Sequence, residues 1–171
     1  MIAATVRFAT AHDAEVILRF IRGLAEYERE PDAVKATAAG LRAQMESASP
    51  PFECLIADDG NTPIGFALFY RSYSTWLGQP ALFLEDFFVE KKYRGRGAGF
   101  ALIKRLAEIA RERGYSRLEW RVLDWNQPAH RFYRSIGAFP IDEWTVWRVE
   151  GDALDRLAQD TSNATRTNGN G

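Results

Sequence analysis

Two adjoining stretches of the chain carry residues whose types and spacing suit chemistry beside an anionic ligand. Residues 82–89 form an apolar run that contains two adjacent carboxylates, Glu85 and Asp86, and a basic, glycine-rich segment follows over residues 91–99. Glycines let the backbone turn sharply, and the N-terminus of a following helix presents unsatisfied N–H groups to an anion. This order predicts a phosphate-binding loop beside an acidic pocket.

Two widespread phosphate-binding motifs do not fit this loop. A mononucleotide-binding P-loop has Lys followed by Ser or Thr after its last glycine, but Gly99 is followed by Phe100. A dinucleotide-binding fingerprint has a third glycine three residues after its second, and with Gly95 and Gly97 as the first two that position holds Phe100. The anion is therefore expected to belong to a different kind of cofactor.

The pattern Arg94-x-x-Gly97-x-Gly99, between an expected strand and an expected helix, resembles the coenzyme A pyrophosphate loop of the GNAT acetyltransferases. The resemblance extends over residues 5–158 and is closest to the diamine acetyltransferase branch, nearer to its thialysine type than to its spermidine type. The segments that match that branch in order are residues 84–89, 93–95, 123–128 and 132–138.

The resemblance implies that acetyl-CoA is the co-substrate, and that its pantetheine arm pairs with the backbone of a strand splayed from its neighbour. Asn126 is also implied to bind the cofactor, although an Asn before Gln127 and Pro128 equally suits a helix N-cap. The cofactor-binding residues expected on this basis are Phe88, Val89, Arg94, Gly95, Arg96, Gly97, Ala98, Gly99 and Asn126.

The adjacent carboxylates suit the deprotonation of an amine. An alkylammonium with a pKa of about 10.4 must lose its proton before it can attack a thioester, which costs about 4 to 5 kcal/mol at neutral pH. We expect Glu85 to accept the proton, directly or through water, and Asp86 to attract the cationic substrate, and these roles could be exchanged. Successive strand residues point to opposite faces, so a bulge is needed to aim both at one substrate. The structural alternative is that one of them pairs with an arginine elsewhere.

The departing coenzyme A thiolate needs a proton, and a tyrosine with a pKa of about 10 matches a thiol of about 8.5. Tyr133 stands where the general acid of the family lies, so the resemblance implies that role for it. The alternative is that Phe132 and Tyr133 pack a short helix onto the sheet. A backbone N–H near Val89 would stabilise the tetrahedral oxyanion.

Aromatic and acidic residues elsewhere suit an amine substrate through cation–π and ionic contacts, and Tyr27, Glu28 and Trp76 are expected to bind it together with Asp86. The alternative is that Tyr27 and Glu28 end a solvated helix and Trp76 packs under a loop. The spermidine type has Asp-Pro where this chain has Ser74 and Thr75, which favours a shorter diamine or an amino acid with a terminal side-chain amine. The alternatives are acetylation of a protein N-terminus or lysine, and a coenzyme A-binding module without catalysis.

Strands and helices alternate along the chain, which predicts a mixed α/β sheet, and the resemblance implies a GNAT-type sheet, mostly antiparallel, splayed at its centre and flanked by helices. Thr10 with Asp13 resembles a capping box before a first helix, and Thr37 is the expected cap of a second. A helix after the glycine-rich loop should end near Gly114, and a short one should cover residues 128–136. The expected strands are residues 4–8, 53–57, 64–70, 82–89, 118–123 and 144–149.

Composition limits the other classes of function. The chain has 171 residues with 46% hydrophobic content, which predicts one domain, and the resemblance implies that residues 1–159 form an N-acetyltransferase domain. Residues 160–171 consist mainly of Thr, Asn and Gly, which predicts a disordered polar tail. A net charge of −1 gives no general attraction to nucleic acid. Cys54 is the single cysteine and no leader opens the chain, so we expect a cytoplasmic protein without a disulfide, a metal site or a membrane span. The resemblance implies a homodimer.

Overall fold

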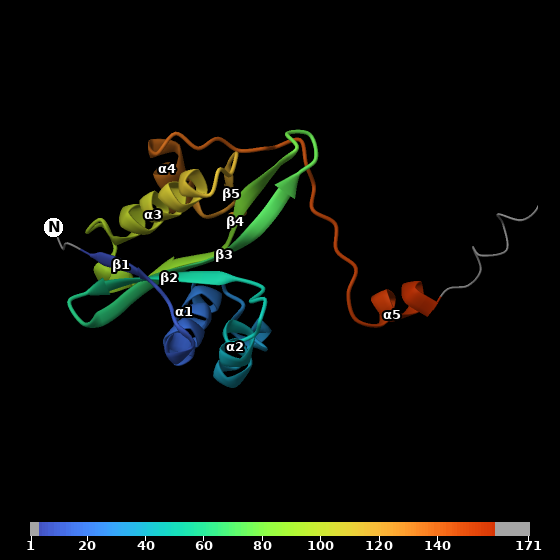
Figure 1. The fold of residues 1–171 in the computed structure, drawn as a ribbon, viewed down its shortest axis with the longest axis horizontal. Helices are drawn as coiled ribbons and strands as arrows, with labels where there is room; N and C mark the ends of the chain where they lie inside the picture. Colours follow the sequence, from blue (N-terminus) through green and yellow to red (C-terminus); the bar gives the residue numbers. More distant parts are fainter. Residues whose placement is uncertain (1–3, 160–171) are drawn as a thin grey trace, which may run out of the picture. The chain divides into compact units, whose positions relative to one another are not determined.

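The computed structural model describes residues 4–159, and the chain divides into two compact units (Figure 1). The first unit ends at Leu123 and the second begins at Asp124. The single domain expected over residues 1–159 stays a prediction, and the tail expected over residues 160–171 lies outside the described residues. No helix in the described part of the chain is long and apolar enough to cross a membrane.

A five-stranded sheet organises the first unit, with its strands in the order β1-β2-β3-β4-β5. Neighbouring strands are antiparallel except for β4 and β5, which are parallel. This confirms the mixed, mostly antiparallel fold, although the strand expected at its centre, β4, lies fourth in the order. The strands are β1 (Thr5–Phe8), β2 (Glu53–Asp59), β3 (Thr62–Ser74), β4 (Gln79–Val89) and β5 (Leu118–Trp120).

Helices cover both faces of this sheet, with α1 and α2 on one face and α3 on the other (Figure 1). Consecutive residues of β4 show the two faces, because the Phe88 ring lies against Gly23 of α1 whereas the Phe87 ring lies against Gly99 of α3. The helices are α1 (Ala14–Tyr27), α2 (Ala38–Met45) and α3 (Ala98–Glu112), with single 3₁₀ turns at Ala11–Asp13, Pro31–Ala33 and Lys91–Tyr93.

The starts of the first two helices follow the local signals in the sequence. The Thr37 hydroxyl accepts a hydrogen bond from the third residue after it at 3.1 Å, which caps α2. The backbone N–H of Thr10 donates to the carboxylate of Asp13 at 2.8 Å, as in a capping box. The apolar stripe of α1 then packs onto the sheet, where the rings of Phe20 and Phe66 stack 5.5 Å apart.

Two of the expected strands differ from the structure. The strand expected over residues 118–123 stops at Trp120, because β4 pairs with it only as far as Leu84. The strand expected over residues 144–149 is wrong, since the described chain forms no strand there and Trp147 is 90% exposed. Alternating apolar residues favour a strand, but a strand also needs a neighbour that satisfies its backbone hydrogen bonds, and none of the five described strands pairs with residues 144–149.

The described part of the second unit contains two helices, α4 (Gln127–Ser135) and α5 (Asp152–Gln159). The first confirms the helix expected over residues 128–136, with Gly137 at φ +85° just after its end. The second was not expected from the sequence. Its signal was present, because Leu154 and Leu157 are three residues apart and acidic residues lie in its first turn.

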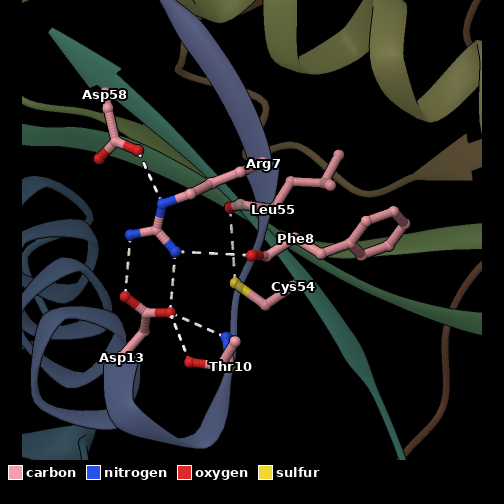
Figure 2. Close-up of polar contacts among 7 residues, drawn as sticks. All are labelled: Arg7, Phe8, Thr10, Asp13, Cys54, Leu55 and Asp58. Carbon is pink, nitrogen blue, oxygen red and sulfur yellow. Dashed lines mark hydrogen bonds and ion pairs between the residues drawn. The ribbon is translucent and has the colours of Figure 1, made fainter. Parts of the chain in front are cut away.

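Arg7 fastens the edge strand β1 to its neighbours (Figure 2). Its Nε donates to Asp58 of β2 at 2.8 Å, and its two terminal nitrogens each donate to Asp13 at 2.9 Å. The guanidinium lowers the pKa of Asp13 below its ordinary value. Because the Asp58 side chain is buried, removal of the arginine would leave two carboxylates without their cation.

We therefore expect Arg7→Gln to lower the free energy of unfolding at pH 7 by about 1 to 3 kcal/mol, measured by urea denaturation. The matched control is Arg105→Gln, because Arg105 also bonds two acids, Glu108 and Glu112, on the exposed side of α3. An exposed helical pair of this kind contributes about 0.5 kcal/mol or less. Equal losses in the two variants would contradict the anchoring role of Arg7.

Candidate active site

A β-bulge interrupts β4 at the two carboxylates. Leu68 of β3 is opposite Asp86, and the next residue, Phe69, is opposite Leu84, so that Glu85 is an extra residue without a partner in the ladder. A bulge allows two successive side chains to project from the same face of a sheet. The structure thus supplies the irregularity that the sequence required if Glu85 and Asp86 were to serve one site.

Asp86 lies on the sheet face that α1 and α2 cover, because its partner Leu68 belongs to the core cluster beneath these helices. The pKa of the half-buried Asp86 carboxyl is raised to about 6, chiefly by burial and also by the nearby charges of Glu85 and Glu28, against an opposing effect of Arg121. The residues between 4 and 159 provide no hydrogen bond to this side chain. A carboxylate poised just below neutral pH suits the acceptance of a proton.

Glu85 lies on the same face but is bound to an arginine. The Nη2 of Arg121 donates to its two carboxylate oxygens at 3.0 and 2.9 Å. The Arg121 guanidinium also lies 5.2 Å from the ring centroid of Phe83, which pairs across the sheet with Tyr70, two residues from Leu68. The structural alternative considered for one carboxylate, an ion pair with an arginine, is therefore the arrangement of Glu85.

The glycine-rich loop leads from β4 into α3 as the sequence predicted. Gly95 and Gly97 have φ values of +74° and +98°, a region that residues with a Cβ rarely adopt, and α3 begins at Ala98. A Cβ at Gly99 would lie 3.3 Å from the Phe87 ring. The first N–H groups of α3 have no acceptor within the helix, so they are available to an anion.

Arg94 holds the base of this loop. Its Nε donates to the carbonyl of Val89 at 2.8 Å, and its guanidinium lies 4.6 Å from the ring centroid of Tyr27 and 5.4 Å from that of Phe88. These contacts tie the loop to the end of β4 and to the end of α1. The guanidinium of Arg96, which is also exposed, lies 5.9 Å from the ring centroid of Tyr93.

The edge of β4 opens beyond the bulge. β4 and β5 pair only from Leu82 to Leu84, so no strand of the described chain pairs with that edge from Glu85 to Val89. The N–H of Glu90 donates to Ile64 of β3, and successive strand residues direct their backbone groups to opposite edges, so the backbone of Val89 faces this open edge. The Val89 carbonyl accepts from the Arg94 side chain. The expected splay between the two strands is confirmed, and an extended ligand could pair with the exposed backbone as an added strand does.

The residues of the expected amine site are only partly brought together. Tyr27 and Glu28 end α1, where Tyr27 lies under Arg94 and burial raises the pKa of the Glu28 carboxyl. Trp76 lies instead in the exposed turn between β3 and β4. Six residues of β4 separate the end of that turn from Glu85, a length of about 20 Å along the strand.

Tyr133 and Asn126 belong to the second unit, on and before α4. The Asn126 side chain accepts a hydrogen bond from the N–H of Ala129 at 3.3 Å, so it caps that helix as one interpretation anticipated. The ring centroids of Phe132 and Tyr133 are 5.5 Å apart. The roles expected for Tyr133 and Asn126 stay predictions.

Arg121 is the residue that the sequence analysis missed. Its signal was its place in the expected strand over residues 118–123, beside the strand that contains Glu85. The register of the two parallel strands decides this contact. Leu84 is opposite Trp120, so the next residues, Glu85 and Arg121, lie side by side. Among the described residues no group of three or more His, Cys, Asp or Glu side chains is arranged to hold a metal ion.

An open groove of about 590 Å³ lies on the first unit between α1 and the end of β4, and Phe88 and Lys91 are among the residues that line it. Arg19, Arg22, Glu26 and Glu90 line it with mixed charge, and Arg19 is already bound to Glu90 at 2.6 Å. Neither Glu85 nor Asp86 lines this groove. The acidic pair therefore lies outside this groove, although the groove borders the start of the basic, glycine-rich segment.

Comparison with known proteins places this arrangement in context. Residues 17–138 match the model of the acetyltransferase (GNAT) family. The chain is 41% identical over 164 residues to the thialysine N-epsilon-acetyltransferase of Bos taurus, and the aligned region covers 90% of this chain and 96% of that protein. It is 28% identical to an L-ornithine N5-acetyltransferase of Arabidopsis thaliana, over 89% and 86% of the two chains. Among solved structures, an integron cassette protein from the V. cholerae mobile metagenome is similar, with a TM-score of 0.77, 27% identity and coverage of 94% and 100%.

Proposed function

We infer that this protein, which belongs to the acetyltransferase (GNAT) family and is an N-acetyltransferase acting on an amine, uses acetyl-CoA as its donor. Its acceptor is the primary amine of a small diamine or of an amino-acid side chain, of the thialysine, lysine or ornithine kind. Relatives named for thialysine and ornithine acetylation support this substrate class. The protein works in the cytoplasm as a homodimer.

The observation that supports this proposal is the bulge that aims two carboxylates at one face of β4, immediately before a glycine-opened helix. The loop fits a coenzyme A pyrophosphate, because its glycines have positive φ and the first N–H groups of α3 point beyond the helix. The open edge of β4 suits the extended pantetheine arm. Acetyl-CoA supplies an activated thioester, and the residues of this chain supply the proton transfers.

The contacts favour an exchange of the roles first expected for the two carboxylates. Asp86 is the proton acceptor, because burial raises the pKa of its carboxyl to about 6 and no hydrogen bond from residues 4–159 occupies it. At neutral pH it is mostly ionised and can take the proton of the incoming ammonium. Glu85, bound by Arg121, contributes to substrate binding.

Tyr133 donates the proton that the departing thiolate needs, and the backbone N–H of Val89 stabilises the oxyanion. Phe88, Asn126 and the loop from Arg94 to Gly99 bind the cofactor. Tyr27, Glu28 and Trp76 contact the amine, and Trp76 reaches the site of a partner subunit.

Release of coenzyme A thiol from acetyl-CoA tests the proposal, with thialysine, lysine, ornithine, putrescine, spermidine and a lysine-containing peptide as acceptors. We expect the short amines to exceed spermidine and the peptide by about tenfold or more in kcat/KM, since each unmatched charged contact costs about 1.4 kcal/mol or more. Preference for the peptide would overturn the substrate class in favour of protein acetylation. Binding of coenzyme A without turnover of any amine would overturn the small-amine proposal.

A further inference from the structure

We propose that Arg121 and Glu85 together form a clamp for the α-carboxylate and α-ammonium groups of an amino-acid substrate. Arg121 would hold the carboxylate and Glu85 the α-ammonium, while Asp86 receives the proton of the reacting side-chain amine. This inference rests on the proposed function. It narrows the substrate class to amino acids with a terminal amine, as distinct from diamines.

The hydrogen bonds of Arg121 leave most of its donors unused. Both contacts with Glu85 come from the single nitrogen Nη2, and no hydrogen bond from Nε or Nη1 reaches any residue between 4 and 159. A guanidinium has five N–H donors in a planar fork that matches a carboxylate with two parallel bonds. The guanidinium can therefore donate hydrogen bonds to a second carboxylate while it keeps its bonds to Glu85.

The surroundings hold the guanidinium in place and leave it accessible. It lies over the ring of Phe83, with 5.2 Å between the guanidinium carbon and the ring centroid, which limits the orientations of its plane. The side chains of Arg121 and Glu85 are 49% and 40% exposed, so a small ligand can reach both. The ring of Tyr70 lies on the same face, with its centroid 5.3 Å from that of Phe83.

The order of charges along this face matches an amino acid better than a diamine. Arg121 is positive, Glu85 beside it is negative, and Asp86 is a second negative group one residue further along the bulge. A lysine-like substrate has a carboxylate, an α-ammonium and a distant ammonium in the same order. A diamine has no carboxylate for Arg121, so the arginine would only repel its cationic end.

The experiment compares two substrates that differ by one carboxylate, lysine and cadaverine, with ornithine and putrescine as a second pair. The variant is Arg121→Gln, and the matched control is Arg117→Gln, because Arg117 is a similarly exposed arginine bonded to Glu119 at the start of β5. We expect the wild-type protein to prefer lysine over cadaverine.

In Arg121→Gln we expect kcat/KM for lysine to fall by about tenfold to a hundredfold, mainly through KM, because a charge-assisted bond is lost. The value for cadaverine should stay constant or rise. Arg117→Gln should leave the ratio of the two substrates unchanged. Arg121→Lys should restore part of the preference, since it keeps the charge but not the planar fork.

An equal loss for lysine and cadaverine in Arg121→Gln would show a merely structural role and overturn the clamp. An unchanged ratio in a variant that melts at the wild-type temperature would overturn it as well. Both results leave the proposed function intact, because the wild-type protein still acetylates small amines. If the wild-type protein acetylated neither substrate nor any other small amine, the proposed function would fail and the clamp with it.

Discussion

Asp86→Asn should lower kcat/KM for the amine by about a hundredfold to ten-thousandfold, which is the usual contribution of a positioned base. In the wild-type protein kcat/KM should rise with pH through about 6, because the Asp86 carboxyl must be ionised to accept a proton and burial raises its pKa to about 6. This rise of kcat/KM near pH 6 should be absent from the residual activity of Asp86→Asn. The measurement is the pH dependence of kcat/KM between pH 5 and 8 at saturating acetyl-CoA.

Glu85→Gln is the comparison that separates the two carboxylates. It retains the length of the side chain but removes the anion that Arg121 binds, so it should mainly raise KM for the amine. The rise of kcat/KM near pH 6 should persist in this variant. If the rise of kcat/KM near pH 6 were lost in Glu85→Gln and kept in Asp86→Asn, Glu85 would be the base, as first expected from the sequence.

The free energy of unfolding serves as a control for the folding of Asp86→Asn. The direction in which it changes with pH follows from the pKa of Asp86 in the folded and unfolded states. The folded-state pKa of about 6 lies above the ordinary value of 3.8, so the folded protein retains a proton that the unfolded chain releases between these values. Ionisation of Asp86 thus reduces stability as pH rises through this window. Asp86→Asn should be at least as stable as the wild-type protein at pH 8, and a loss of activity there reflects chemistry rather than unfolding.

Tyr133→Phe should lower kcat by about a hundredfold or more, with little change in the affinity for acetyl-CoA, because only the acid hydroxyl is lost. The ring that lies 5.5 Å from Phe132 is retained, so α4 should keep its packing. Single-turnover measurement of thiol release gives the chemical step, and equilibrium binding of coenzyme A gives the affinity.

The control for this variant is Tyr115→Phe, which removes a tyrosine hydroxyl just after α3 and outside the proposed site. Its kcat should match that of the wild-type protein. Unchanged turnover in Tyr133→Phe would exclude Tyr133 as the acid and support the packing interpretation. A parallel loss of coenzyme A affinity would make it a cofactor-binding residue.

The sequence by itself determined the features that depend on neighbouring residues. The caps at Thr10 and Thr37, the apolar stripe of α1, and the loop that opens α3 with Gly95 and Gly97 all follow from contacts within a few residues. The motif around this loop was specific enough to give the family before any contact was known. Local rules suffice there because the interacting atoms are fixed by spacing along one helix or turn.

Only the tertiary structure decided which side of the sheet each acidic residue serves and what binds it. The bulge at Glu85 is a property of the pairing between β3 and β4, and the partner of Glu85, Arg121, lies 36 residues away on the continuation of β5. The missing strand over residues 144–149 has the same cause, because alternation in sequence does not decide whether a segment pairs with a neighbouring strand, and none of the five described strands pairs with this one. Strand pairing joins residues that are distant in the chain, so its register, and with it the chemistry of Glu85 and Asp86, is fixed by the folded sheet.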